Sequence, residues 1–130
     1  MTNKRIETSR APAAIGPYSQ AVAVAEWVYC SGQVALDPDD PQMVGDGDIE
    51  AETRRVLQNL DAVLQAGGES RGDVVKATVY LTNMDEFSKM NQVYGAFFAG
   101  LVPPARATVQ VAALPKGAKV EIDFVARISD

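Results

Sequence analysis

The chain has 130 residues, of which 47% are hydrophobic and 22% are charged. This composition is typical of one globular domain, large enough for a core but small for enclosing a deep site alone, so we expect a single domain over residues 1–130. The formal net charge is −5, from 12 basic and 17 acidic residues, and the chain has no run of Lys or Arg. Because phosphate contacts dominate affinity for nucleic acids, this balance argues against a nucleic-acid or anionic-membrane partner.

The content of His and Cys restricts the chemistry. With no His and one Cys, the chain lacks the members of the usual zinc sites and of Ser-His or Cys-His pairs. Cys30 lies in an apolar segment, where a small buried side chain is expected rather than a nucleophile. No apolar stretch has the length of a membrane span, and the first residues lack the apolar core of a signal peptide. We therefore expect a soluble cytoplasmic protein and metal-free, non-covalent chemistry.

Three strands are predicted in the first third of the chain, at residues 4–8, 20–24 and 27–34. The second and third flank the short turn Ala25-Glu26, which is typical of a hairpin. A long loop rich in Asp, Pro and Gly follows at residues 36–47.

The next segment has the pattern of an amphipathic helix with Asp48 as its N-cap and Ala66 near its end. Gly67-Gly68 supplies the stop. The apolar residues at helical spacing are Ile49, Val56, Leu57, Leu60, Val63 and Leu64. The face predicted to contact water carries Glu52, Arg55, Gln58, Asn59 and Asp61.

A strand rich in β-branched residues is predicted at residues 74–82, followed by a second helix. Asn83 and Glu86 have the spacing of a capping pair, and the helix runs to about Phe98. Its predicted inner stripe consists of Phe87, Met90, Tyr94, Phe97 and Phe98. Asn91 falls inside this stripe, and a buried amide must find hydrogen-bond partners.

Two alternating segments, 106–113 and 119–128, predict strands separated by the breaker Leu114-Pro115-Lys116-Gly117. Arg106 and Glu121 lie on the polar faces of these successive strands. A guanidinium matches a carboxylate bidentately, and a nearby acid can orient or deprotonate water, so the pair suits hydrolysis of a small acidic substrate. The alternative is an ordinary cross-strand ion pair, which spacing alone favours because structural pairs outnumber catalytic ones.

Four motifs resemble those of the reactive intermediate deaminase family, RidA, also called YjgF-type or endoribonuclease L-PSP proteins. The C-terminal motif is PARATVQVAALP, residues 104–115, followed by VEID at 120–123. The others are AIGPYSQA at 14–21, SGQ at 31–33 and NQVYGAFF at 91–98. They occur in the family's order and cover nearly the whole chain.

The resemblance implies an α+β fold like that of chorismate mutase, a mixed sheet backed by two helices, assembled as a homotrimer with clefts between subunits. It implies hydrolysis of a 2-imino or 2-amino-enoic acid to a 2-keto acid and ammonia, without a cofactor. Arg106 would bind the substrate carboxylate and Glu121 would position the attacking water. The pocket would be lined by Tyr18, Ser31, Asn91 and Thr108, with the backbone of Gly32 close to the ligand. The sequence itself offers apolar area for the core or the interface at Val22, Val24, Val109 and Val111.

Each of these residues also has an ordinary structural interpretation. Tyr18 suits a turn, Ser31 a local strand hydrogen bond, and Asn91 a satisfied core or helix-end amide. Thr108 stands where some deaminating members have Cys, and Ala107 stands where Ser or Thr is common. These departures concern the substrate range rather than the class of reaction.

Two other functions remain open at this stage. The same pocket could capture a 2-keto acid or a related metabolite without turnover, because a fold does not guarantee activity. A ribonuclease or translation-inhibitor function is less favoured, because the chain lacks His and a basic, aromatic surface for RNA. The presence of both Arg106 and Glu121 favours the enzyme.

Overall fold

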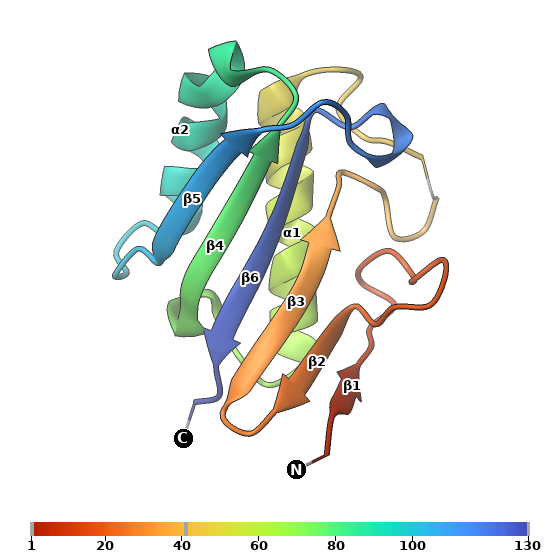
Figure 1. Cartoon of the computed structure of the whole chain (residues 1–130), viewed down its shortest axis with the longest axis vertical. Coiled ribbons are helices and arrows are strands. Elements are labelled where there is room, and N and C mark those ends of the chain that lie inside the picture. Colours follow the sequence, from red (N-terminus) through yellow and green to blue (C-terminus); the bar gives the residue numbers. More distant parts are fainter. Residues whose placement is uncertain (1, 41, 130) are drawn as a thin grey trace.

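The computed structural model describes residues 2–40 and 42–129, and its central feature is a six-stranded mixed sheet. The strands lie in the order β1-β2-β3-β6-β4-β5 (Figure 1). Their bounds are β1 Lys4–Ile6, β2 Ala21–Val24, β3 Trp27–Gln33, β4 Val74–Leu81, β5 Ala105–Gln110 and β6 Val120–Arg127. Neighbouring strands are antiparallel except β4 and β5, which are parallel. The predicted strands are confirmed, although β5 ends at Gln110 rather than at residue 113.

Two helices cover one face of this sheet (Figure 1), which confirms the predicted α+β architecture. Helix α1, Ile49–Ala66, begins as predicted, because the Asp48 side chain accepts a hydrogen bond from the Glu50 backbone N–H at 3.1 Å. Helix α2 spans Phe87–Phe97 and lies behind β4 and β5 at one edge of the sheet.

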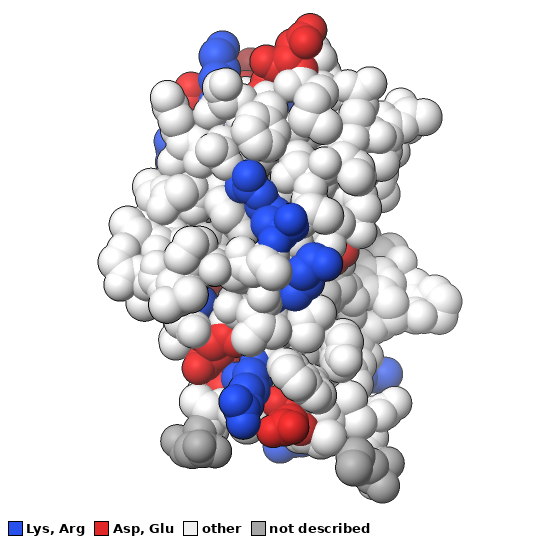
Figure 2. Space-filling view, turned by 60° about the vertical axis from the view of Figure 1, so that its left-hand side comes forward, with Lys and Arg blue, Asp and Glu red and all other residues white. Residues whose placement is uncertain are grey.

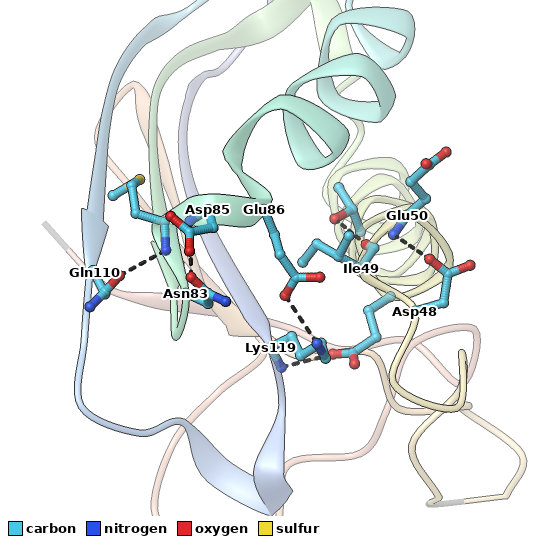
Figure 3. Close-up of polar contacts among 11 residues, drawn as sticks. Asp48, Ile49, Glu50, Asn83, Asp85, Glu86, Gln110 and Lys119 are labelled. Atoms are coloured by element: carbon cyan, nitrogen blue, oxygen red, sulfur yellow. Dashed lines mark hydrogen bonds and ion pairs between the residues drawn. The ribbon is translucent and has the colours of Figure 1, made fainter.

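The start of α2 differs from the predicted capping pair. Asn83 accepts a hydrogen bond from the Asp85 backbone N–H, but it caps a single 3₁₀ turn at Met84–Glu86 that precedes the helix. Glu86 turns away from Asn83 and forms an ion pair with Lys119 at 3.0 Å (Figure 3). The acid is therefore used to join α2 to the start of β6.

The hydrophobic core lies between the sheet and the helices. Its largest members are Leu57, Leu60, Val63 and Leu64 from α1, Met90 and Tyr94 from α2, and Val79, Leu81, Ile122 and Phe124 from the sheet. The predicted alternation along β6 is confirmed, because its even-numbered residues are buried. Cys30 is also buried, as predicted, and burial together with the charge of Asp123 raises the pKa of its thiol to about 12.

Two residues predicted to face water on α1 are instead buried. Glu52 is 3% exposed and accepts a hydrogen bond from the Lys119 backbone N–H at 2.9 Å. Asn59 is fully buried and donates to the carbonyls of Val34 and Leu36 at 3.3 and 3.0 Å. The loop after β3 covers Asn59, and the residue before β6 covers Glu52, so both side chains satisfy backbone groups rather than contacting water.

The other face of the sheet is not covered by any element of the described residues (Figure 1). Val22, Val24 and Val109 lie on this open face, because their strand neighbours point toward the helices. Tyr29 and Val109 are 50% and 42% exposed. None of the described helices has the length and apolar character required to cross a membrane.

Candidate active site

Helix α2 and strand β5 together hold Arg106. In the sheet, Arg106 pairs with Ala77, which is fully buried, so the arginine points toward the helix side. Its Nη1 donates to Oδ1 of Asn91 at 2.7 Å. Its guanidinium carbon lies 4.7 Å from the ring centroid of Tyr94 and 5.5 Å from that of Phe87. A hydrogen bond and two aromatic faces therefore orient the guanidinium.

This arrangement corrects two expectations about which way side chains point. Asn91 is exposed rather than buried, because Met90 and Tyr94 occupy the inward positions of α2. Its partner is a charged side chain, not a core or helix-end group. In β5 the polar residues Arg106 and Thr108 face the helix layer, and the small and apolar residues face the open side. The predicted alternation along β5 is confirmed, but its apolar residues lie on the uncovered face of the sheet.

A hollow of about 460 Å³ adjoins the arginine, and we call it the Arg106 hollow. Its lining includes Asn91, Tyr94, Phe98, Pro103, Pro104 and Arg106. Figure 2 turns the α2 and β5 side toward the viewer and shows Lys and Arg side chains across its middle, with acidic side chains gathered toward its ends. This distribution of charge suits an anionic ligand.

Two buried hydroxyls lie on the same side of the sheet. The hydroxyls of Tyr94 and Thr108 have no hydrogen-bond partner among the described residues. Burial raises the pKa of Tyr94, and the positive charge of Arg106 opposes this effect. Tyr94 was predicted only as a core residue, because helical spacing does not show that its ring lies against Arg106.

Glu121 lies on the opposite face of the sheet. Its neighbours Val120 and Ile122 are fully buried toward the helices, so the Glu121 side chain projects from the open face. The register of β3 and β6 shifts between Cys30 and Gln33, and Gly32 lies in this irregular stretch. A Cβ atom on Gly32 would overlap Oε2 of Glu121. The missing side chain of Gly32 therefore makes room for the carboxylate.

A second hollow of about 350 Å³ adjoins Glu121, and we call it the Glu121 hollow. Its lining includes Ile15, Tyr18, Gly32, Leu36, Lys116 and Glu121. Tyr18 is 49% exposed, so its ring is free to contact a ligand. Burial is the larger cause that raises the pKa of Glu121, and the charge of Asp123 adds to it. A carboxylate with a raised pKa binds a proton more strongly, which suits a general base.

Ser31 and Gln20 hold the loop that carries Tyr18. The Ser31 hydroxyl donates to the carbonyl of Ser19 at 2.6 Å, in line with the local structural interpretation of this residue. The buried Gln20 amide donates to the Pro12 carbonyl at 2.8 Å and accepts from the Thr8 N–H at 2.7 Å. No site role was predicted for Gln20, and the only signal in the sequence that marks it is its place inside the N-terminal motif AIGPYSQA.

The two halves of the predicted site do not meet within one chain. Strand β4 lies between β5 and β6, so the strands of Arg106 and Glu121 are not neighbours. Their side chains project from opposite faces of the sheet. No ion pair of the described residues joins Arg106 to Glu121, so the cross-strand ion pair considered from the sequence is wrong. Within one chain, Arg106 and Glu121 therefore lie in two separate hollows.

Comparison with known proteins decides the family. A sequence profile described as Endoribonuclease L-PSP matches residues 8–128. The chain belongs to this family. Protein DfrA of Myxococcus xanthus is 52% identical over 97% of this chain and 96% of its own length. The mouse protein named 2-iminobutanoate/2-iminopropanoate deaminase is 50% identical over 95% of this chain and 90% of its own.

The fold of the endoribonuclease L-PSP family agrees closely with this structure. A Yersinia pestis protein of the Rid family, described as of unknown function, superposes with a TM-score of 0.95 at 46% identity, over 98% of this chain and all of that one. The resemblance inferred from the four motifs is thus confirmed. Relatives with similar identity carry different names, so family membership supports deaminase chemistry without fixing the activity of this member.

Proposed function

We propose that this protein hydrolyses 2-imino acids, or the 2-amino-enoic acids that tautomerise to them, to 2-keto acids and ammonia. Arg106 carries the proposal, because its oriented guanidinium opens on a hollow large enough for a small anion. Deaminases named for 2-iminobutanoate and 2-iminopropanoate among the relatives support the same class of substrate.

The reaction needs little beyond orientation and charge. Water adds to the electrophilic C2 carbon of the imine, the C=N bond becomes C–N, and the resulting carbinolamine expels ammonia to leave the ketone. Arg106 binds the carboxylate as a bidentate partner and fixes the position of C2. Glu121 accepts a proton from the attacking water and returns it to the leaving nitrogen. Tyr18, Gly32 and Thr108 shape the pocket around these two groups.

A complete site requires a second copy of the chain, because Arg106 and Glu121 face opposite sides of one sheet. The open face supplies a surface for such a contact, with half-exposed Tyr29 and Val109 on it. We propose a homotrimer with three clefts between subunits, each cleft combining the Arg106 hollow of one chain with the Glu121 hollow of the next. A cyclic arrangement joins unlike surfaces in this way and closes on itself.

The first experiment measures ammonia and keto-acid release from 2-iminobutanoate or 2-aminoacrylate generated in situ by a dehydratase or an amino-acid oxidase. The protein should accelerate release, and Arg106→Ala should abolish the acceleration. Arg54→Ala, which removes an exposed guanidinium on α1, serves as the matched control and should remain active. If no imine is hydrolysed faster than it decays, but a 2-keto acid still binds through Arg106, the protein is a metabolite-binding module and not an enzyme.

A mixing experiment tests the shared cleft. Arg106→Ala and Glu121→Gln should each be inactive alone. In a random trimer of the two variants, one cleft of every mixed ring receives both native side chains, so equal amounts should restore about a quarter of the wild-type sites. Light scattering would report the mass of the assembly at the same time. A monomer, or a mixture that stays inactive after subunit exchange is shown, would contradict the shared cleft.

A further inference from the structure

Glu121 does not stand alone on the open face of the sheet. Asp123 is two residues along β6 and therefore projects from the same face, about 7 Å away along the strand. Tyr80 of β4 is the direct partner of Glu121 in the sheet. The Tyr80 hydroxyl donates to Oδ2 of Asp123 at 3.0 Å. A tyrosine on the neighbouring strand thus holds a second carboxylate beside the first.

Most groups that surround Glu121 are uncharged. Strand β3 presents Gly32, which has no charge, and β4 presents the neutral hydroxyl of Tyr80. The loop before β2 presents Tyr18, and the turn before β6 presents the exposed Lys116, both at the margin of the Glu121 hollow. No ion pair of the described residues involves Glu121. Asp123 is therefore the anion fixed closest to it by the backbone.

We propose that Asp123, held in place by the Tyr80 hydroxyl, sets the pH range in which Glu121 can accept a proton from bound water. Asp123 does not touch the substrate in this proposal; it acts through Glu121, and Tyr80 positions it. The proposal rests on the role of Glu121 in the proposed function.

The physical basis is repulsion between like charges. A negative charge beside a carboxylate favours its protonated form, so the neighbour takes up a proton more readily. The direction agrees with the raised pKa of Glu121, to which burial contributes most and Asp123 next. The hydrogen bond from Tyr80 fixes the position of the Asp123 carboxylate beside Glu121. Burial and Asp123 raise the pKa of Tyr80 itself, so this hydroxyl keeps the proton that it donates.

The test compares wild type with Asp123→Asn in the assembled protein, so that any charge brought by a second subunit is present in both. Asparagine keeps the shape of Asp123 and an oxygen that accepts from Tyr80, but removes the charge. Carbon-detected NMR of labelled Glu side chains follows the titration of Glu121, with Glu121→Gln for assignment. We expect the pKa of Glu121 to fall in Asp123→Asn, because the repelling charge is removed. Asp85→Asn, which removes an exposed acid in the 3₁₀ turn before α2, should leave the pKa of Glu121 unchanged.

The kinetic readout is the acidic limb of kcat/KM against pH. In Asp123→Asn this limb should move to lower pH by the same amount, which a purely structural role would not produce. Tyr80→Phe should move it in the same direction by a smaller amount, and this variant serves if Asp123→Asn does not fold. An unchanged titration of Glu121 overturns the inference whatever the activity. A lowered pKa in a protein that hydrolyses no imine, wild type included, supports the inference and refutes the proposed function.

Discussion

Gly32→Ala is expected to remove activity while leaving the fold intact. A Cβ at this position would overlap Oε2 of Glu121 and lie 2.9 Å from Cδ, closer than van der Waals contact allows. The atoms in the way are the end of a flexible side chain, so the carboxylate can rotate aside. The backbone of Gly32 does not lie in the left-handed region, so alanine is not strained there. The substitution therefore acts on the position of Glu121 rather than on the strand.

Gly32→Ala should therefore have a small effect on stability and a large effect on the rate. Alanine in a strand gains about 0.5–1 kcal/mol over glycine, which offsets much of the cost of moving the carboxylate, so the free energy of unfolding should change by less than about 1 kcal/mol. A catalytic group displaced by about 1 Å costs roughly 100-fold in rate, so kcat/KM for imine hydrolysis should fall by about that factor.

The assay pairs urea unfolding with initial rates of keto-acid release. Gly72→Ala is the matched control, because its new Cβ would meet only ordinary contacts at 3.6 and 3.8 Å in a 3₁₀ turn. That variant should keep wild-type rates. If Gly32→Ala keeps more than half of the wild-type rate at unchanged stability, then Glu121 either is not catalytic or works from another position, and our reasoning about this contact fails.

Three further predictions concern the frame around the site. Asn59→Ala should lower the free energy of unfolding by about 1–3 kcal/mol in urea titrations, because it leaves two buried loop carbonyls without a donor; a change near zero would mean that water replaces the amide. Glu52 has a pKa raised chiefly by burial, so its contribution to stability is present below its unfolded pKa and is lost as pH rises through its folded pKa. Glu52→Gln keeps an acceptor for the Lys119 N–H, so its Tm should lack this decline across mildly acidic pH, and parallel Tm curves for both proteins would refute the assignment. Cys30 should react with a thiol reagent only after unfolding, because it is 6% exposed and its pKa is about 12, and rapid labelling of the native protein would contradict its burial.

The sequence predicted the elements well because local signals determine them. The N-cap of α1, the glycines that end it and the alternation along β6 each depend on neighbouring residues, and each is found as expected. The polar side of α1 was misjudged for a different reason. The loop after β3 buries Asn59, and the residue before β6 buries Glu52. Both segments are distant in the sequence, and helical periodicity does not show which distant segments will cover a helix face.

The arrangement of Arg106 and Glu121 also depends on contacts between segments that are distant in the sequence. The motifs identified Arg106, Asn91 and Glu121, but the order of the strands decides that the arginine and the acid face opposite sides. The parallel β4–β5 pair places β4 between two strands that follow each other in sequence. Periodicity along β5 separated polar from apolar residues correctly. That periodicity did not show that Arg106 faces the helices, where Asn91 and two aromatic rings contact its guanidinium.

Lys119 joins the elements that lie between Arg106 and Glu121, and this bears on how the proposed site would form. Lys119 binds Glu52 of α1 through its backbone and Glu86, just before α2, through its side chain (Figure 3). The ion pair between Lys119 and Glu86 therefore links the start of β6, which carries Glu121, to the start of α2, whose Asn91 binds Arg106. Hinge motion inside one chain cannot carry two groups on opposite faces of a packed sheet to the same ligand. In the cleft that we propose, the contact between subunits sets the distance between the guanidinium and Glu121. Substitutions on the open face should therefore alter activity through assembly even when they touch neither hollow.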